Sequence, residues 1–206
     1  MITSGETTQA THSQSEEVAR LLALVEAAVH ARVSLLQLRE KRLSARSLYE
    51  LTTRAAAITR GSATRLLVND RADIARAARA DGVHLTTRSL EAHTLRRAFG
   101  DDFLIGVSTH SLEEARAACD GGADFATFGP VFETVSKRVY GPPVGLEKLN
   151  EAARTLSPFP LLALGGITQE NAAAAIGAGA SGVAAIRLFN DRHNLSAVVR
   201  AIRSST

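Results

Sequence analysis

Short apolar runs alternate with alanine-rich segments along nearly the whole chain. The apolar runs predict strands at residues 33–38, 65–68, 82–85, 103–107, 125–128, 160–164 and 182–186. The segments around them predict helices near residues 14–31, 44–60, 71–79, 88–98, 111–120, 145–156, 168–178 and 194–203, with Ser111 and Thr168 as helix caps. Nearly continuous apolar strands that alternate with helices are typical of a parallel sheet covered by helices.

The number of strands separates two fold classes. Seven strands suggest an open doubly wound sheet, whereas eight close into a TIM (β/α)8 barrel. Residues 1–3 supply an eighth strand that is very short or truncated. Polar residues follow nearly every strand, as in a barrel, whereas an open sheet gathers them at one switch point. We therefore expect an α/β chain that forms a single TIM-barrel domain over residues 1–206.

Composition excludes several classes of function. No apolar run in the 206 residues reaches the ~18 to 20 needed to cross a bilayer, and residues 1–15 lack the pattern of a signal peptide. A net charge of +3 with scattered arginines and only 4% aromatic residues argues against nucleic-acid binding. The single cysteine, Cys119, is expected to be an inert core residue, and a reducing cytoplasm is the expected location.

Polar residues at the end of the first long strand suggest an anion site. Gln37, Arg39 and Lys41 alternate with apolar neighbours, so they share one face of the strand. An amide and two cations on a buried face are costly unless an anion binds there. The alternative is a strand end whose polar residues simply emerge into solvent.

Three later segments also carry polar or glycine residues at strand ends. Asp70 after Asn69 is either a Mg²⁺ ligand or part of a turn or helix cap. Gly165 and Gly166 either admit a phosphate at a helix N-terminus, near the cation Arg187, or allow tight packing. The long loop at residues 129–145 is either a flap over the substrate or an insertion of no consequence.

Together these segments resemble the superfamily of thiamine phosphate synthase and thiazole tautomerase. The matching stretches are residues 37–41 (Gln-Leu-Arg-Glu-Lys), 67–73, 81–85, 105–111, 128–137, 164–167 and 178–184. They occur in the family's order and cover about residues 1–190. The resemblance implies a TIM barrel and a cytoplasmic enzyme that acts on small phosphorylated molecules, and a homodimer is the oligomer to test for.

The synthase branch joins hydroxymethylpyrimidine diphosphate to thiazole phosphate and releases pyrophosphate. By resemblance, Arg39, Lys41, Ser108 and Lys137 are the catalytic residues, and Asp70 binds Mg²⁺. The resemblance assigns substrate binding to those four residues and to Gln37, Asn69, Thr134, Ser136, Gly165, Gly166, Ile186 and Arg187. Leaving-group stabilisation by fixed charges suits such a reaction better than a protein base does.

Two departures from the synthase pattern leave alternatives open. Ser89 stands where the synthases carry a second Mg²⁺ carboxylate, and Arg187 stands where they carry serine. We place the synthase first and the tautomerase second, although Pro130 replaces the tautomerase histidine and only His110 is left to substitute for it. A non-catalytic barrel that binds a thiamine precursor is the third alternative.

Overall fold

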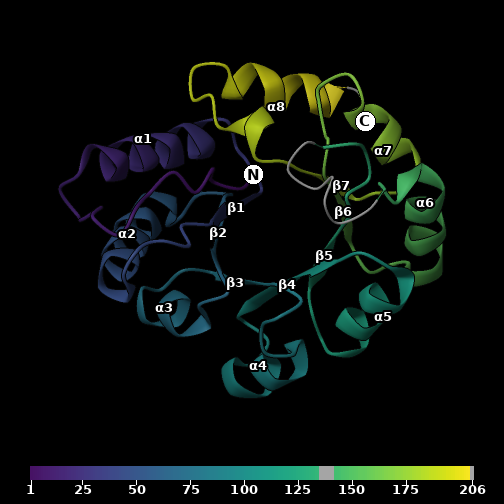
Figure 1. Ribbon diagram of the computed structural model, residues 1–206, viewed down its shortest axis with the longest axis horizontal. Coiled ribbons are helices and arrows are strands. Elements are labelled where there is room, and N and C mark those ends of the chain that lie inside the picture. Colours follow the sequence, from purple (N-terminus) through teal and green to yellow (C-terminus); the bar gives the residue numbers. More distant parts are fainter. Residues whose placement is uncertain (135–141, 205–206) are drawn as a thin grey trace. The chain divides into compact units, whose positions relative to one another are not determined.

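The computed structural model describes residues 1–134 and 142–204. They form two compact units, each described below by itself (Figure 1). Unit 1 comprises Met1–His84 with Phe189–Arg200, and unit 2 comprises Leu85–Leu188 with Ala201–Thr206. The single domain expected over residues 1–206 stays a prediction.

Unit 1 contains three helices that alternate with three strands, beginning with a helix. Its helices are α1 (Glu16–His30), α2 (Ala45–Thr59) and α3 (Ala72–Ala77), and its strands are β1 (Leu35–Leu38), β2 (Arg65–Asn69) and β3 (Gly82–Leu85). The strands pair in parallel, with Leu36 opposite Leu66 and Val68 opposite Val83. These four side chains are fully buried. Figure 1 shows α2 and α3 on the same side of the strands, so the apolar strand residues form the core beneath them.

The N-terminal segment adds a short strand-like pairing to β1. Ile2 forms a parallel bridge with Gln37, whose backbone N–H donates to Met1 O at 3.0 Å and whose carbonyl accepts from Thr3 N at 3.0 Å. The side chain of Asn190 donates to Ile2 O at 2.7 Å. The expected pairing of residues 1–3 is therefore present, but only as one isolated bridge.

Unit 2 contains four further parallel strands and their helices. The strands are β4 (Leu104–Thr109), β5 (Phe125–Phe128), β6 (Leu161–Leu164) and β7 (Gly182–Ala184), and they pair in that order. The helices are α4 (Ala92–Phe99), α5 (Leu112–Asp120), α6 (Gly145–Leu156) and α7 (Ala172–Gly177). A 3₁₀ turn, η2 (Arg187–Phe189), follows β7, and α8 (Leu195–Ser204) has residues in both units.

Local side-chain bonds explain where the predicted boundaries differ from the structure. Ser111 caps α5 as expected, since its hydroxyl accepts from Glu114 N at 3.2 Å. Thr168 also makes the bonds of a helix cap: its hydroxyl accepts from Asn171 N at 3.3 Å, its backbone N–H donates to Asn171 Oδ1 at 2.8 Å, and its carbonyl accepts from Ala172 N at 3.1 Å. The regular helix α7 begins only at Ala172, so the predicted start at residue 168 was four residues early.

Two predictions about composition can also be compared with the structure. Cys119 is free and half-buried near the end of α5, so its assignment to the core was wrong. No helix within the described ranges is long and apolar enough to cross a membrane.

Candidate active site

The amide side chains of Gln37 and Asn69 meet at the carboxyl ends of two neighbouring strands. Gln37 lies on β1 and Asn69 is the last residue of β2. Gln37 Nε2 donates to Asn69 Oδ1 at 3.1 Å. Gln37 is 5% exposed and Asn69 is half-buried. This contact orients both amides, because it fixes which end of Gln37 donates and which end of Asn69 accepts.

Two cations follow directly after β1. Arg39 is half-buried, and within residues 1–134 and 142–204 its guanidinium forms no ion pair. Lys41 is exposed. A half-buried guanidinium without a carboxylate partner can bind an anionic group. Of the polar face predicted for residues 37–41, the structure shows Gln37 in contact with the polar end of β2.

Asp70 occupies a special backbone position beside Asn69. Its φ is +60°, a left-handed conformation that Asp and Asn tolerate better than most residues. Its backbone N–H donates to His84 O at 2.9 Å. Helix α3 begins at Ala72 with Arg71 at the cap position, so the alternative of Asp70 as helix cap was wrong. Asp70 is exposed.

The residue after Asp70 is engaged in a local ion pair. Arg71 Nη2 lies 2.6 Å from an oxygen of Asp73, and its Nε lies 2.9 Å from the other oxygen. These hydrogen bonds raise the pKa of Arg71 and lower the pKa of Asp73. The carboxylate of Asp73 is therefore already paired with Arg71. Among the described residues, no group of three or more His, Cys, Asp or Glu side chains is arranged to hold a metal ion.

His84 is buried on β3, as expected for a core residue. Burial lowers its pKa from 6.5 to about 4, and the positive N-terminus adds to this shift. The N-terminal amine of Met1 is buried as well and donates to Leu35 O at 2.9 Å, and burial lowers its pKa to about 5. Both groups are therefore neutral in the folded protein at pH 7.

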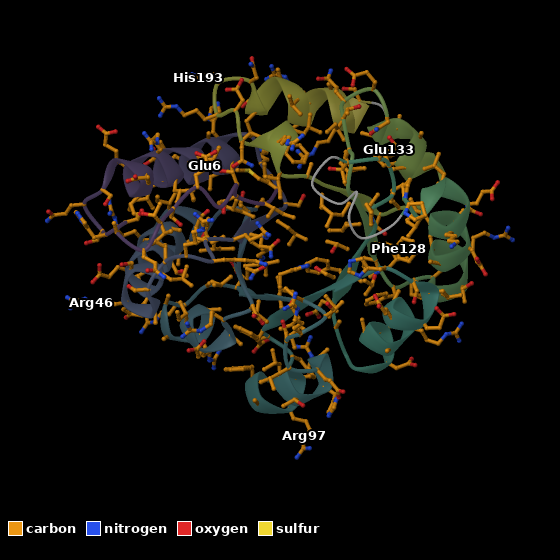
Figure 2. The ribbon with its side chains drawn as sticks, in the orientation of Figure 1. Glu6, Arg46, Arg97, Phe128, Glu133 and His193 are labelled. Atoms are coloured by element: carbon orange, nitrogen blue, oxygen red, sulfur yellow. The ribbon has the colours of Figure 1, made fainter. Side chains whose placement is uncertain are left out.

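In unit 2, the two glycines after β6 lie against the loop after β5. A Cβ on Gly165 would be 2.5 Å from Pro130 Cβ, and one on Gly166 would be 2.5 Å from Glu133 O. Phe128 and Glu133, labelled in Figure 2, mark the end of β5 and this loop. Both glycines have positive φ, at +96° and +66°. The glycine pair therefore packs tightly against this loop, while its role in binding phosphate stays a prediction.

The same glycines do not open a helix, so that part of the phosphate prediction was wrong. Residues 165–171 form a connecting segment, with Asn171 Nδ2 donating to Gly166 O at 2.9 Å. In the described part of the chain, the backbone N–H groups of Gly166 and Ile167 have no hydrogen-bond acceptor. Two neighbouring backbone donors of this kind suit an anionic ligand.

The remaining predicted residues of unit 2 follow other strand ends. Ser108 is half-buried on β4, opposite Thr127 of β5, and Thr134 is half-buried in the loop after β5. Ile186 is half-buried after β7, while Arg187 is exposed at the start of η2.

The loop after β5 is only partly described. Ser136 and Lys137 lie outside the described residues. The described ends of this loop are tied together, since Val144 N donates to Pro130 O at 2.8 Å and Gly145 N donates to Val131 O at 3.2 Å. The flap stays a prediction.

The residue at the position of the missing family carboxylate is part of a turn. Ser89 Oγ accepts from Thr86 N at 2.7 Å and lies 3.0 Å from the Thr86 hydroxyl. His110, the substitute considered for the tautomerase histidine, pairs with Glu114 through its backbone N–H at 2.7 Å and its ring at 3.2 Å. Both side chains therefore serve local turns at strand or helix ends.

Sequence reasoning missed one buried acid. Glu40 is 3% exposed, and its carboxylate accepts hydrogen bonds from Thr3 and Thr7. Its position was the available signal: it follows Leu36 and Leu38 on the alternating face that a strand buries.

A cavity of about 310 Å³ in unit 1 is lined by Ser4, Glu6 and Thr7, by residues of α1 and by residues 190–193. Glu6 and His193, labelled in Figure 2, belong to its lining. None of the predicted site residues lines this cavity. The geometry of the strand ends, rather than the size of this cavity, identifies the candidate site.

Comparison with known proteins gives a consistent result. Residues 9–189 match the family described as thiamine monophosphate synthase. The thiamine-phosphate synthases of Roseiflexus sp. and Moorella thermoacetica are each 40% identical to this chain; the matches cover 88% of it in both cases, and 76% and 86% of the relatives, respectively. The solved structure of a thiamine phosphate pyrophosphorylase from Pyrococcus furiosus has a TM-score of 0.80 at 26% identity, covering 93% of this chain and 91% of that chain.

These likenesses test the main predictions from the sequence. The structural neighbour confirms a TIM-like α/β fold with parallel strands and alternating helices. The relatives confirm the prediction of a transferase of the synthase type. The match over residues 9–189 covers most of the 206 residues. This chain belongs to the thiamine monophosphate synthase family.

Proposed function

We propose that this chain couples hydroxymethylpyrimidine diphosphate to thiazole phosphate in thiamine biosynthesis. In this reaction the C–O bond to the diphosphate breaks, pyrophosphate leaves with the electron pair, and the thiazole nitrogen forms the new C–N bond. The observation that carries the proposal is the joined amide pair of Gln37 and Asn69 at the ends of β1 and β2, with the half-buried Arg39 two residues after Gln37 along the chain. Oriented amides suit a pyrimidine ring, and a fixed cation suits its diphosphate.

Charge stabilisation is the main task of unit 1 in this proposal. As the C–O bond breaks, negative charge grows on the leaving pyrophosphate. Arg39 offers a planar donor fork to its oxygens, and Lys41 adds a flexible cation. Gln37 and Asn69 hold the pyrimidine, so the cations act on a diphosphate in a fixed position.

The donor set beside Asn69 fits a magnesium ion. Mg²⁺ is commonly held by one or two carboxylates together with substrate phosphates, and Asp70 supplies one exposed carboxylate at the end of β2. Bound Mg²⁺ would neutralise diphosphate charge. Ser89 supplies only a hydroxyl, which already accepts from Thr86 N. The arginine side chains of the site therefore take a larger share of the charge in this proposal.

We assign the thiazole phosphate and the rest of the diphosphate to residues of unit 2. The backbone N–H groups near Gly166 and the hydroxyl of Thr134 are suited to a phosphate. Ser108 and Lys137 contact the diphosphate or the reacting pyrimidine. The proposed thiazole phosphate site is completed by Ser136, Gly165, Ile186 and Arg187. We also propose a single catalytic domain, a cytoplasmic location and, as the assembly to test, a homodimer.

An end-point assay tests this proposal directly. The protein is incubated with both substrates and Mg²⁺, and thiamine phosphate is detected after oxidation to its fluorescent thiochrome. We expect product from the wild type, and a loss of at least tenfold in Arg39→Ala, because a charge-assisted contact to the leaving group is removed. Arg46→Ala is the matched control, since Arg46 lies on the exposed face of α2 and pairs with Glu50.

The outcomes separate the alternatives. Product from the wild type and from Arg46→Ala, with little from Arg39→Ala, supports the synthase. No product from folded wild type refutes it, and the thiazole carboxylate phosphate is then offered to test the tautomerase. Binding of thiazole phosphate without turnover of either compound would support a precursor-binding protein.

A further inference from the structure

Glu40 is a buried carboxylate in a position that the reaction itself does not explain. It follows Arg39, two residues after β1 ends at Leu38, and it continues the alternate positions of Leu36 and Leu38. Leu36 and Leu38 are fully buried, and Glu40 is 3% exposed. A buried charge is costly unless hydrogen bonds compensate for its lost hydration. The hydrogen-bond partners of Glu40 therefore indicate its role.

Both oxygens of Glu40 bind the segment at residues 3–7. Thr3 Oγ1 donates to Oε1 at 2.6 Å, and Thr7 Oγ1 donates to Oε2 at 2.7 Å. The backbone N–H of Thr7 also points to Oε2, at 3.4 Å. Short bonds from a hydroxyl to a carboxylate are among the stronger hydrogen bonds in proteins. Glu40 thus anchors this segment at two points, four residues apart.

The anchored segment lies against Arg39. Thr3 Oγ1 accepts from Arg39 N at 2.9 Å while it donates to Glu40, so one hydroxyl joins both residues. Gly5 sits between the two anchors with φ +76°. A Cβ at Gly5 would be 3.1 Å from Arg39 O and 3.6 Å from Arg39 Nη1. The segment therefore passes close to both the backbone and the guanidinium of Arg39.

We propose that Glu40 is a positioning residue for Arg39. Through Thr3 and Thr7, it holds residues 3–7 against the guanidinium and so limits the conformations of that side chain before a ligand binds. Ordering a long side chain on binding weakens affinity, so ordering it beforehand strengthens binding of the anion. This inference rests on the proposed function only for the identity of that anion, the pyrimidine diphosphate.

Substitutions at Thr3 and Thr7 test the proposal with less disturbance of the buried structure than removal of Glu40. Thr3→Val and Thr7→Val keep the shape of the side chain and delete the hydroxyl that donates to Glu40. Thr3→Ser keeps the hydroxyl and serves as the matched rescue variant, and Glu40→Gln is the direct variant. Steady-state kinetics then give KM separately for hydroxymethylpyrimidine diphosphate and for thiazole phosphate, together with kcat.

We expect the valine variants to raise KM for the diphosphate substrate by up to about tenfold, the range that loss of one pre-ordered side chain would produce. KM for thiazole phosphate stays within about twofold, and Thr3→Ser returns the first KM to the wild-type value. If the valine variants melt at lower temperature while both KM values stay at wild-type levels, the role of Glu40 is structural only and the proposal is overturned.

A second measurement keeps the inference separate from the proposed function. Wild type without turnover would refute the synthase, and phenylglyoxal modification of Arg39, followed by peptide mass spectrometry, then tests positioning without any substrate. Arg46, which is exposed on α2, is the internal reference. Faster modification of Arg39 in Thr3→Val, restored to the wild-type rate in Thr3→Ser, supports positioning. Equal rates in all three proteins overturn it.

Discussion

Acid should destabilise this protein through His84. The folded-state pKa of His84 is about 4, lowered from 6.5 mainly by burial. At a pH between these two values, the ring is neutral in the folded protein and protonated in the unfolded chain. Between those two pH values the unfolded state binds more protons than the native state, and stability therefore falls as the pH falls. The contribution of His84 is complete above about pH 6.5 and is lost as the pH approaches about 4.

The size of the effect follows from this difference in pKa. About 2.5 units correspond to roughly 3.4 kcal/mol over the whole range, and about 1.8 kcal/mol of this is lost between pH 7 and pH 5. The buried amine of Met1, with its pKa lowered to about 5, shifts stability in the same direction. It is present in wild type and variant alike, and its charge contributes to the shift of His84, so the difference between the two proteins reports His84 together with this coupling.

The assay is urea unfolding of wild type and His84→Gln at pH 7, 6 and 5. Both proteins lose stability in acid, but the loss between pH 7 and pH 5 should be smaller in the variant by about 1.8 kcal/mol. His30→Gln, at an exposed position near the end of α1, is the matched control and should follow the wild type. Equal losses in wild type and His84→Gln would refute the reasoning, whatever their absolute stabilities.

Three further substitutions test other parts of the structure. Gly166→Ala should lower the free energy of unfolding, measured in urea, by about 1 to 3 kcal/mol. The added Cβ would lie 2.5 Å from Glu133 O, and the φ of this residue is positive. Unchanged stability would contradict the tight packing. Ser111→Ala should cost about 1 kcal/mol by loss of the α5 cap, and no change in the urea midpoint would argue against that cap. Ser89→Asp should lower the Mg²⁺ concentration for half-maximal synthase activity, because it adds a carboxylate. The new side chain can still accept from Thr86 N, as Ser89 does. An unchanged Mg²⁺ titration would show that this position does not face the metal.

The strands and most helices were predictable because their signals are local. The segment at residues 65–68 is short and holds three consecutive apolar residues, and β2 occupies it with one further residue. Ser111 was correctly identified as a cap because the geometry of a cap involves only three or four residues. Thr168 likewise makes the bonds of a helix cap with Asn171 and Ala172. The regular helix α7 nevertheless begins only at Ala172, because the exact start of a helix is less predictable than the presence of a cap.

The residues of the candidate site were predictable from the sequence, whereas the contacts that hold those residues in place were less predictable. Gln37 and Asn69 were each found from a strand end, and the register of β1 against β2 then brought them to 3.1 Å. The glycine pair had two physical readings, and the contacts of Gly165 with Pro130 could not be foreseen, since the loop after β5 is far away in sequence. Long-range packing of this kind requires coordinates.

The stretch at residues 36–41 shows how one short strand end can specify both a site and its support. Its odd positions carry Gln37 and Arg39, which are assigned to the proposed ligand, and its even positions carry Leu38, which belongs to the core, and Glu40, which binds Thr3 and Thr7. Because the side chains of a strand alternate, each polar residue that serves the ligand is followed by one that fixes the backbone beneath it. Substitutions at odd positions should therefore remove ligand contacts directly. A substitution of Glu40 should act on the ligand only through Arg39, and that difference is what separate KM values can detect.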